Sequence, residues 1–367
     1  MSKFVITYTP CFQKNMIREL LEFDKSIDVK EVLPNGILII ESELSSEEFM
    51  KRAMEKSPIF IKHLMPIMRE GIITENFNED KEAILNKVKE ITNLESGDPF
   101  SVQCRVVSGK SNGRLEYSSK DVEVYVGSTY EEKGCKPVFS DYNLTNDDVD
   151  IISVLISKGK FYVGFSTNKQ NLNFHCDEYR ICSKKGREIS RAENKLKEAL
   201  SKFNVNLSGE GYALDIGAAP GGWTKVLADH GYNVIAVDPG NLKPELENDP
   251  RITHYKCRIE DLKFDNFFDI IVNDMNVDPE VTAQIMNGLS NSLKDEGLAV
   301  VTLKLPSNFD EGITEASKIL SEYYDVLTIK SLFHNRQEVT ALIKKKQLEN
   351  KLDEPMQLKL SNPEITN

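Results

Sequence analysis

The sequence has little of what would mark a secreted or membrane-spanning protein. Only six of its 367 residues are cysteine, and no two of them form a Cys-x-x-Cys pair. A disulfide framework, or a zinc site of the usual spacing, is therefore not expected. The longest apolar runs, such as Ile151–Ile156, are much shorter than the roughly 20 residues that span a bilayer. Residues 1–10 also lack the apolar core of a signal peptide. We expect a soluble, cytoplasmic chain with no membrane partner.

Clustered metal ligands are equally scarce. His175, Cys176 and Cys182 lie close together, but no fourth ligand lies near them in the sequence. A structural zinc site normally has four ligands. We therefore predict no metal, and we treat these cysteines as ordinary buried or half-buried thiols.

Positive charge is in deficit as well. The 46 Lys and Arg residues face 58 Asp and Glu residues, which gives a net charge of −12. A protein that coats nucleic acid non-specifically is basic, because neutralisation of phosphate supplies most of that affinity. The balance argues against a general polyanion binder, and we predict no DNA partner, but a local basic surface is still allowed. One such window runs from Arg180 to Lys202, where basic residues crowd together.

The composition nevertheless allows ordinary domains, because 40% of the residues are hydrophobic and disorder needs less. Residues 1–75 predict the order βαββαβ, which is typical of a ferredoxin-like α+β fold. Its elements are Lys3–Tyr8, Phe12–Phe23, Val29–Val32, Ile37–Ile40, a helix after the capping box Ser45–Glu48, and Phe60–Ile67. The polar stretch Glu75–Glu82 is predicted to be a connector.

A second α+β unit is predicted over residues 80–170. Its β-rich segments are Phe100–Val107, Val149–Ile156 and Phe161–Phe165. The segment Ser118–Tyr130 is ambiguous, because Asp121–Val126 alternates like a strand whereas the flanking Ser and Glu residues suit a helix.

Residues 180–345 alternate between β-rich and helical patterns, which predicts a doubly wound α/β domain. The predicted strands are Tyr212–Ile216, Asn233–Val237, Arg251–Tyr255, Phe268–Asn273, Leu298–Leu303 and Val339–Ile343. The predicted helices are Trp223–Asp229, Val281–Leu293, Glu311–Tyr323 and one that begins at Ser190 with the capping box Ser190–Glu193. The polar tail, residues 346–367, is predicted to be disordered.

The sharpest motif is the turn after the first strand of this domain, Asp215-Ile-Gly-Ala-Ala-Pro-Gly-Gly-Trp223. Such a strand–turn–helix is where doubly wound folds bind nucleotides, and its glycines let the backbone approach a ligand closely. Ala219 stands where the dinucleotide motif has a glycine, and Pro220 removes an amide that a pyrophosphate would use. The ligand is therefore predicted to be a nucleoside without phosphates.

Two carboxylates follow the next strands of the predicted sheet. Asp238 ends the second strand, where it would accept both hydroxyls of a ribose. Asp261 follows the third β segment and could accept a hydrogen bond from an adenine amino group. S-adenosylmethionine, an adenosine that carries a sulfonium and no phosphate, is the nucleoside that fits.

Four charged residues are predicted to meet at the same crevice, namely Lys195, Asp274, Lys304 and Glu338. A lysine becomes a useful base only if burial or a second cation lowers its pKa towards neutrality. We expect Lys195 to lower the pKa of Lys304 in this way, with Asp274 holding the ammonium and Glu338 orienting Lys195 or the substrate. Such a set would activate a ribose hydroxyl, and methyl transfer would then need alignment and no metal.

At these residues the sequence resembles the FtsJ class of ribose 2′-O-methyltransferases, most closely the RlmM type that modifies a cytidine of large-subunit ribosomal RNA. The glycine turn matches the cofactor loop of that class, and the four charged residues match its Lys-Asp-Lys-Glu tetrad in order. Four further segments carry the likeness to the RlmM type: Pro10–Lys14, Ser190–Leu196, Leu303–Pro306 and Phe333–Thr340.

The resemblance implies a Rossmann-like methyltransferase domain preceded by ferredoxin-like and THUMP-type modules, with residues 118–130 helical. It implies that Lys304 accepts the proton and that S-adenosylmethionine is the cofactor. The cofactor site would comprise Ser190, Asp215, Gly217, Ala219, Pro220, Gly221, Gly222, Trp223, Asp238, Asp261 and Asp274. The residues predicted to lead RNA to Lys304 are Lys184, Lys185, Arg187 and Arg191.

The leading hypothesis is a ribose 2′-O-methyltransferase acting on structured RNA, namely large-subunit ribosomal RNA, as a monomer or weak dimer. Two alternatives stay open at this point. The chain could be a non-catalytic RNA-binding or ribosome-assembly factor that keeps S-adenosylmethionine as a structural ligand. It could also methylate a protein or a small molecule, an option that the acidic charge favours and the extra N-terminal units do not.

Overall fold

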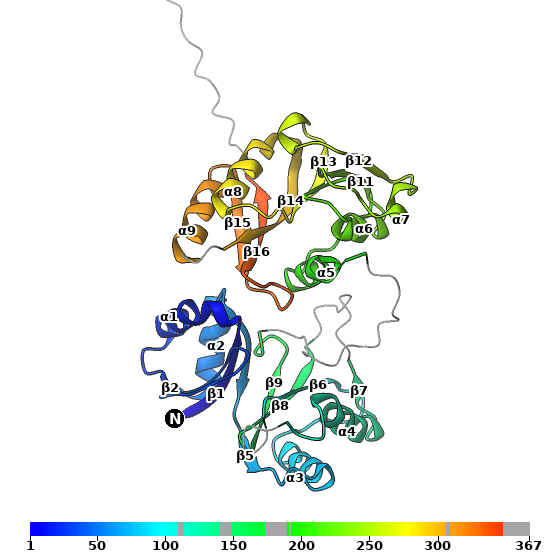
Figure 1. Ribbon diagram of the computed structural model, residues 1–367. Coiled ribbons are helices and arrows are strands. Elements are labelled where there is room, and N and C mark those ends of the chain that lie inside the picture. Colours follow the sequence, from blue (N-terminus) through cyan, green and yellow to red (C-terminus); the bar gives the residue numbers. More distant parts are fainter. Residues whose placement is uncertain are drawn as a thin grey trace, which may run out of the picture.

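The computed structural model describes residues 1–108, 114–138, 148–172, 189–190, 192–207, 209–305 and 309–347, with only the backbone described at 309–311. These residues form three β-sheets. Figure 1 shows the sheet of strands β10–β16, which we call the third sheet, above the other two. No helix among the described residues is long and apolar enough to cross a membrane.

The first sheet has four antiparallel strands in the order β2-β3-β1-β4. Its elements are β1 (Ser2–Tyr8), η1 (Pro10–Phe12), α1 (Gln13–Phe23), β2 (Asp28–Leu33), β3 (Ile37–Ser42), α2 (Ser46–Lys56) and β4 (Ile61–Pro66). The predicted order βαββαβ is therefore present. As expected, the Ser45 side chain caps α2 by accepting a hydrogen bond from the Glu48 amide at 3.2 Å.

Both faces of this first sheet are buried. Helices α1 and α2 cover one face, where Phe4 stacks on Phe49 with 4.2 Å between ring centroids. The opposite face packs against the second sheet, where Met65 joins a cluster that includes Tyr162. The first two sheets thus form one packed body rather than two loosely linked units.

The second sheet has the order β5-β9-β8-β6-β7. Its strands are β5 (Arg69–Ile72), β6 (Pro99–Val106), β7 (Lys136–Pro137), β8 (Asp150–Ser157) and β9 (Lys160–Thr167), and its helices are α3 (Phe77–Lys89) and α4 (Ser119–Glu132). Strands β6 and β8 are parallel, whereas β9 is antiparallel to both β8 and β5. Strand β5 was not predicted, and residues 69–72 belong to this sheet although the predicted first domain included them.

One sequence-based expectation in this unit is wrong, and the ambiguity over residues 118–130 is resolved as the helix that the resemblance implies. The predicted connector Glu75–Glu82 contains the start of α3, because the buried Asp80 carboxylate accepts hydrogen bonds from the Thr74 amide at 2.6 Å and the Tyr117 hydroxyl at 2.8 Å. The alternating segment Asp121–Val126 is not a strand but part of α4. There Val122 and Val126 both face the core, since four-residue spacing returns to one side of a helix.

The third unit is a seven-stranded sheet in the order β12-β11-β10-β13-β14-β16-β15. Its strands are β10 (Tyr212–Ile216), β11 (Asn233–Val237), β12 (Ile252–Tyr255), β13 (Phe268–Asn273), β14 (Leu293–Lys304), β15 (Tyr324–Lys330) and β16 (Glu338–Lys345). All are parallel from β12 to β14, and β16 then runs antiparallel between β14 and β15. The predicted doubly wound α/β fold is present. Strand β15 was not predicted, and its side chains are mostly half-buried or exposed.

Helices cover both faces of the third sheet (Figure 1). They are α5 (Ala192–Lys202), α6 (Gly222–Asp229), the short α7 (Pro244–Glu247), α8 (Pro279–Gly288) and α9 (Phe309–Leu320). Leu214 and Ile216 of β10 point towards the side of α8 and α9, and Ala213 points towards α5 and α6. Such alternation across a strand is what allows a sheet to be buried on both sides.

The first unit also joins the third. The Ser331 amide donates to the Ile59 carbonyl at 2.7 Å, and the Lys330 Nζ donates to the Pro58 carbonyl at 2.7 Å. The same chain turn, residues 58–60, is held by Glu19, whose carboxylate accepts from the amides of Ile59 and Phe60. The segment between β15 and β16 is therefore anchored on the N-terminal unit.

Gly164 of β9 sets how closely the first two sheets approach. A Cβ at Gly164 would lie 2.0 Å from the Pro66 carbonyl oxygen, a backbone atom that cannot move alone. We expect Gly164→Ala to lower the free energy of unfolding by roughly 1–3 kcal/mol or more, measured by thermal and urea unfolding.

The matched control is Gly127→Ala, in the middle of α4. The nearest atom to its added Cβ is 4.0 Å away, so alanine should raise stability by about 0.5–1 kcal/mol through helix propensity. Equal effects of the two substitutions would contradict the described packing of β9 on β4.

Candidate active site at the carboxyl edge of the third sheet

The parallel strands of the third sheet end at one edge, and the predicted site residues lie there. Gly217 follows β10, Asp238 follows β11 and Asp274 follows β13, while Lys304 is the last residue of β14. Glu338 begins β16 directly opposite Lys304 in the antiparallel register. Because carboxyl ends of neighbouring parallel strands meet at a crevice, the topology brings these groups together.

The glycine turn adopts the conformation that its sequence requires. Gly217 has a φ of +75° and Gly221 one of +108°, a region that side chains with a Cβ rarely adopt. A Cβ at Gly217 would also stand 3.1 Å from the backbone of Met275, and one at Gly222 would stand 2.3 Å from the Ser190 Oγ. The turn is therefore a cradle in which added side-chain atoms have no room.

The two carboxylates predicted for the nucleoside lie near this cradle in different settings. Asp238 is half-buried and accepts hydrogen bonds from the amides of Ala219 at 3.2 Å and Gly240 at 2.6 Å. The Asp238 side chain is thus fixed against the Ala219–Gly222 turn. Asp261 lies at the end of η2 (Ile259–Asp261), is exposed, and accepts from the Arg258 amide at 3.4 Å.

Asp215 and Trp223 lie behind the turn. Asp215 is buried and accepts a hydrogen bond from the Thr224 hydroxyl at 2.6 Å. Burial raises the pKa of Asp215 to about 7, and the nearby Asp274 adds to that effect despite the Thr224 hydrogen bond. Trp223 is buried too, and its indole Nε1 donates to the Ala192 carbonyl at 2.7 Å. The structure thus uses Trp223 to fasten the start of α5 onto α6.

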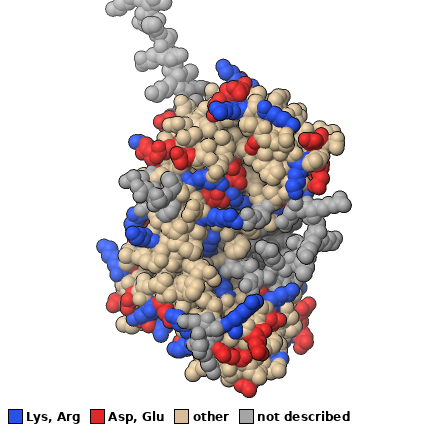
Figure 2. Space-filling view, viewed as in Figure 1, with Lys and Arg blue, Asp and Glu red and all other residues tan. Residues whose placement is uncertain are grey.

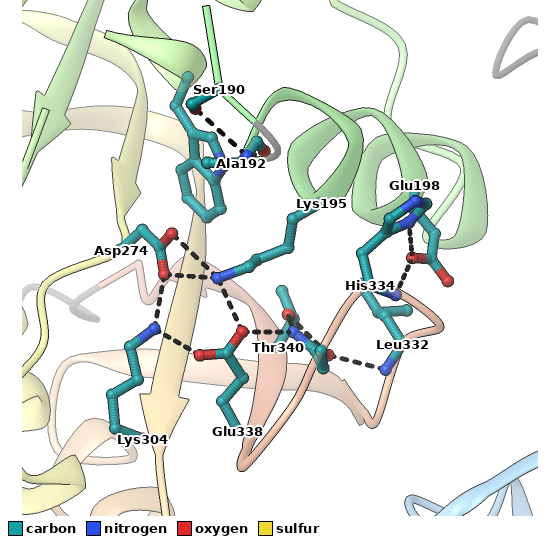
Figure 3. Close-up of polar contacts among 12 residues, drawn as sticks. Ser190, Ala192, Lys195, Glu198, Asp274, Lys304, Leu332, His334, Glu338 and Thr340 are labelled. Carbon is teal, nitrogen blue, oxygen red and sulfur yellow. Dashed lines mark hydrogen bonds and ion pairs between the residues drawn. The ribbon is translucent and has the colours of Figure 1, made fainter. Parts of the chain in front are cut away.

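The four predicted tetrad residues form one cluster of two ammonium groups and two carboxylates (Figure 3). The Lys195 Nζ lies 2.9 Å from Asp274 Oδ1 and 2.7 Å from Glu338 Oε1. The Lys304 Nζ lies 3.0 Å from Asp274 Oδ1 and also forms an ion pair with Glu338 Oε2. Each carboxylate therefore bridges both lysines. Lys195 and Glu338 are buried, while Asp274 and Lys304 are half-buried.

The charge balance of this cluster corrects one expectation. Burial acts to lower the pKa of Lys304, but Asp274 and Glu338 outweigh it, so the pKa is raised from its ordinary value. Burial likewise acts to raise the pKa of Glu338, but Lys195 and Lys304 outweigh it and lower the pKa. The second lysine therefore does not bring Lys304 towards neutrality in this arrangement, because Asp274 and Glu338 both form ion pairs with the Lys304 ammonium.

The segment 331–337, between β15 and β16, supports the tetrad, and we call it the support loop. Asn335 is buried, and its Nδ2 donates to Glu338 Oε1 at 3.4 Å and to the Thr340 hydroxyl at 3.2 Å. Glu198 of α5 is buried beneath the loop and accepts from the amides of Phe333 at 2.6 Å and His334 at 2.9 Å (Figure 3).

Sequence reasoning missed both Glu198 and Asn335. The one available signal was that Glu198 follows Lys195 by three positions, which places both on the same side of α5.

Some predicted positions lie outside the described residues. All four predicted RNA-binding residues are among them: Lys184, Lys185, Arg187 and Arg191. The three metal-ligand candidates considered in the sequence, His175, Cys176 and Cys182, also lie outside the described residues. The regular helix α5 begins at Ala192 rather than Ser190, although the capping box is present in part: the Glu193 carboxylate accepts from the Ser190 amide at 3.4 Å. Within the described part of the chain no group of three His, Cys, Asp or Glu side chains is arranged to hold a metal ion.

Together the strand order, the glycine cradle and the fixed carboxylate after β11 define the Rossmann-like class of S-adenosylmethionine-dependent methyltransferases. The residues present suit that cofactor, because Pro220 gives the turn no amide for a pyrophosphate and the edge offers carboxylates to hydroxyls and to a cation. Residues 189–312 match the family model described as FtsJ-like methyltransferase. The chain therefore carries an FtsJ-like methyltransferase domain.

Relatives extend the likeness beyond this domain. The chain is 28% identical over 360 residues to the uncharacterized protein MJ1257 of Methanocaldococcus jannaschii, covering 93% of this chain and 98% of that one. It is 31% identical over 207 residues to ribosomal RNA large subunit methyltransferase M of Aggregatibacter aphrophilus, covering 50% of this chain and 54% of that one. The match thus spans about half the length of the relatives of that name.

Among solved structures, the crystal structure of TrmN from Thermus thermophilus aligns with 94% of this chain and 100% of its own, at 12% identity and a TM-score of 0.37.

The raised pKa of Asp215 predicts a specific pH dependence of stability. In the folded state Asp215 stays protonated up to about pH 7, whereas its unfolded pKa is about 3.8. The folded state therefore binds more protons between these values, so this group makes the protein less stable as the pH rises from about 4 to about 7. The full effect is on the order of 4 kcal/mol.

Asp215→Asn removes this titration, so the gain in melting temperature over the wild type should grow as the pH is raised from 5 to 8. Asp295→Asn, at an exposed position, is the control and should show no such trend. A constant difference between Asp215→Asn and the wild type at every pH would contradict the prediction.

Proposed function

We propose that the protein is a ribose 2′-O-methyltransferase that acts on structured RNA, namely large-subunit ribosomal RNA, with Lys304 as the general base. The observation that carries this proposal is the cluster in which Asp274 and Glu338 each bridge Lys195 and Lys304. A non-catalytic binding protein has no need for two lysines and two carboxylates held in ion-pair contact at the edge of a cofactor cradle.

The cofactor supplies an activated methyl group on a positively charged sulfur. The chain's own task is to hold the ribose and to remove the proton of its 2′-hydroxyl. Lys304, at the end of β14, is the more exposed of the two lysines, so its Nζ is the one that a substrate hydroxyl would reach. The proton would pass from that hydroxyl to Lys304, while Lys195 stays fixed between the two carboxylates.

The raised pKa of Lys304 gives Glu338 a defined part in this proposal. Lys304 acts as a base only in its neutral form, so at least one of its carboxylate contacts must weaken when substrate binds. A second hydroxyl of the substrate that donates a hydrogen bond to Glu338 would compete with Lys304 for that carboxylate. Lys304 would then lose its ammonium proton to water, and its neutral Nζ would be free to accept the proton of the 2′-hydroxyl. Positioning of this kind supplies much of the rate enhancement in a direct transfer.

The RNA substrate is supported by the relatives named ribosomal RNA large subunit methyltransferase M. The chain matches these relatives over about half of their length. The RNA substrate is also supported by the additional sheets, for which a small substrate offers no use. We propose that residues 1–66 form a ferredoxin-like module and that residues 69–172 form a THUMP-type module, both acting in RNA binding. The basic window that continues from residue 180 would lead the RNA to Lys304.

Lys304→Ala tests the proposed base. Because positioned general bases contribute roughly 10²–10⁴-fold to rate, we expect methyl transfer to fall by at least about 100-fold while S-adenosylmethionine binding stays within about threefold. The assay uses methyl-labelled cofactor with unmodified ribosomal RNA, followed by alkaline digestion, since 2′-O-methylation leaves an alkali-resistant dinucleotide.

Lys318→Ala, at an exposed position on α9, is the matched control and should retain full activity. Label on a base or on protein would overturn the ribose assignment. Full transfer by Lys304→Ala would remove Lys304 from the mechanism. Binding of cofactor and RNA without turnover by the wild type would favour the non-catalytic alternative.

Glu338→Gln tests the charge balance. Glu338 helps to raise the pKa of Lys304, so loss of its charge should shift the rising limb of the pH–rate profile to lower pH. The maximal rate should fall as well, because a neutral amide holds the substrate hydroxyl and the two lysines less strongly than a carboxylate does. Glu315→Gln on α9 serves as the control. If the rising limb of the pH–rate profile stays in place or moves to higher pH, it does not reflect deprotonation of Lys304.

A further inference from the structure

A groove of about 520 Å³ lies where the first unit meets the support loop. One wall comes from the end of β1 and from η1, and a second wall comes from β4 through Lys62 and His63. The third wall is the support loop, with Phe333 and Arg336 among its lining residues. Two segments that stood out in the sequence, Pro10–Lys14 and Phe333–Thr340, thus lie far apart along the chain but contribute to one groove.

The groove and the tetrad share a wall. Asn335 lines the groove and donates a hydrogen bond to Glu338. Gln337 also lines it, and its carbonyl accepts from the Leu305 amide at 2.9 Å, immediately after Lys304. A polymer whose reacting ribose lies at Lys304 would therefore have its neighbouring residue beside this groove.

The chemistry of the groove suits a nucleotide. The Lys62 Nζ lies 5.8 Å from the centre of the Phe333 ring and donates to the Phe333 carbonyl at 3.2 Å, so cation and aromatic ring are held together. Arg336 is exposed at the rim. Aromatic rings that stack bases beside cations that bind phosphates are the usual combination in single-strand RNA sites.

The surface around the junction agrees with an anionic ligand. On the face seen in Figure 2, Lys and Arg side chains lie along the junction between the methyltransferase unit and the N-terminal part, with acidic side chains beside them. In a chain with a net charge of −12, cations placed at the entrance to a groove need a specific reason. Attraction of a phosphate backbone provides one.

We propose that this groove binds one unstacked nucleotide of the RNA strand that adjoins the target nucleotide, with its base against Phe333 and its phosphate on Arg336 and Lys62. The proposal rests on the proposed function and deepens it, since it places a second contact for the same strand. It also explains why the first unit is fastened to the support loop: the loop forms part of both sites.

The test measures binding of a single-stranded ribosomal RNA fragment to the full chain, by fluorescence anisotropy at several salt concentrations. Arg336→Ala should weaken binding and reduce the slope of log affinity against log salt by about 0.7, the value for one lost phosphate contact on a single strand. Phe333→Leu should weaken binding by roughly 5- to 150-fold with an unchanged salt slope. Affinity for S-adenosylmethionine should stay the same in both variants.

Lys318→Ala on α9, another exposed cation, is the control for a general effect of charge. Wild-type affinity and slope in both groove variants would overturn the proposal, as would equal losses in Lys318→Ala. Failure of the proposed function has a different signature, because the wild type would then methylate no RNA. If Phe333→Leu lost activity without losing RNA affinity, Phe333 would be a structural part of the support loop and the nucleotide site would be rejected.

Discussion

The constraint on which the site depends is the neutralisation of four charges at one edge of a sheet. Neither Lys195 nor Glu338 could be buried alone, because an unpaired charge inside a protein costs several kcal/mol. Each is buried with a partner of opposite sign that comes from a different part of the fold: α5, the residue after β13, the end of β14 or the start of β16. The cluster therefore depends on the folding of the whole domain, because α5 and the three strand ends must all be in place before any of these side chains is stable.

Several local interactions maintain that register. The Trp223 indole fastens the first turn of α5 to the helix that follows the glycine turn, so Lys195 and the cofactor cradle are held by the same contact. The antiparallel pairing of β14 with β16 sets Lys304 directly opposite Glu338. Asp215, buried behind the cradle with its raised pKa, shows what the arrangement costs: a carboxyl without a cationic partner is pushed towards its neutral form.

The N-terminal part is joined to the methyltransferase domain through the segment that carries Asn335. A backbone hydrogen bond from the Ser331 amide to the Ile59 carbonyl holds this loop from one side, and the Glu198 carboxylate, which accepts from the amides of Phe333 and His334, holds it from the other. If the proposed RNA substrate contacts the N-terminal part as well as the tetrad, it requires such a connection. Its reacting group and its remote contacts must keep a constant separation, because misplacement by about 1 Å can cost roughly 100-fold in rate.

Much of the architecture followed from local patterns in the sequence. The alternation of β-rich and helical segments, the glycine turn with its positive φ angles and the capping boxes all depend on neighbouring residues. For the same reason the order of elements could be predicted, whereas the four tetrad residues were proposed from their positions at strand ends and from the family resemblance. Tertiary structure decided the features that depend on contacts between residues far apart in the sequence. Val122 and Val126 fit both a strand and a helix, and only packing selected α4. The pKa of Lys304 rises instead of falling because Asp274 and Glu338 approach it from other strands. The support loop, Glu198 beneath it and the groove beside it arise from contacts across the chain, for which no local pattern exists.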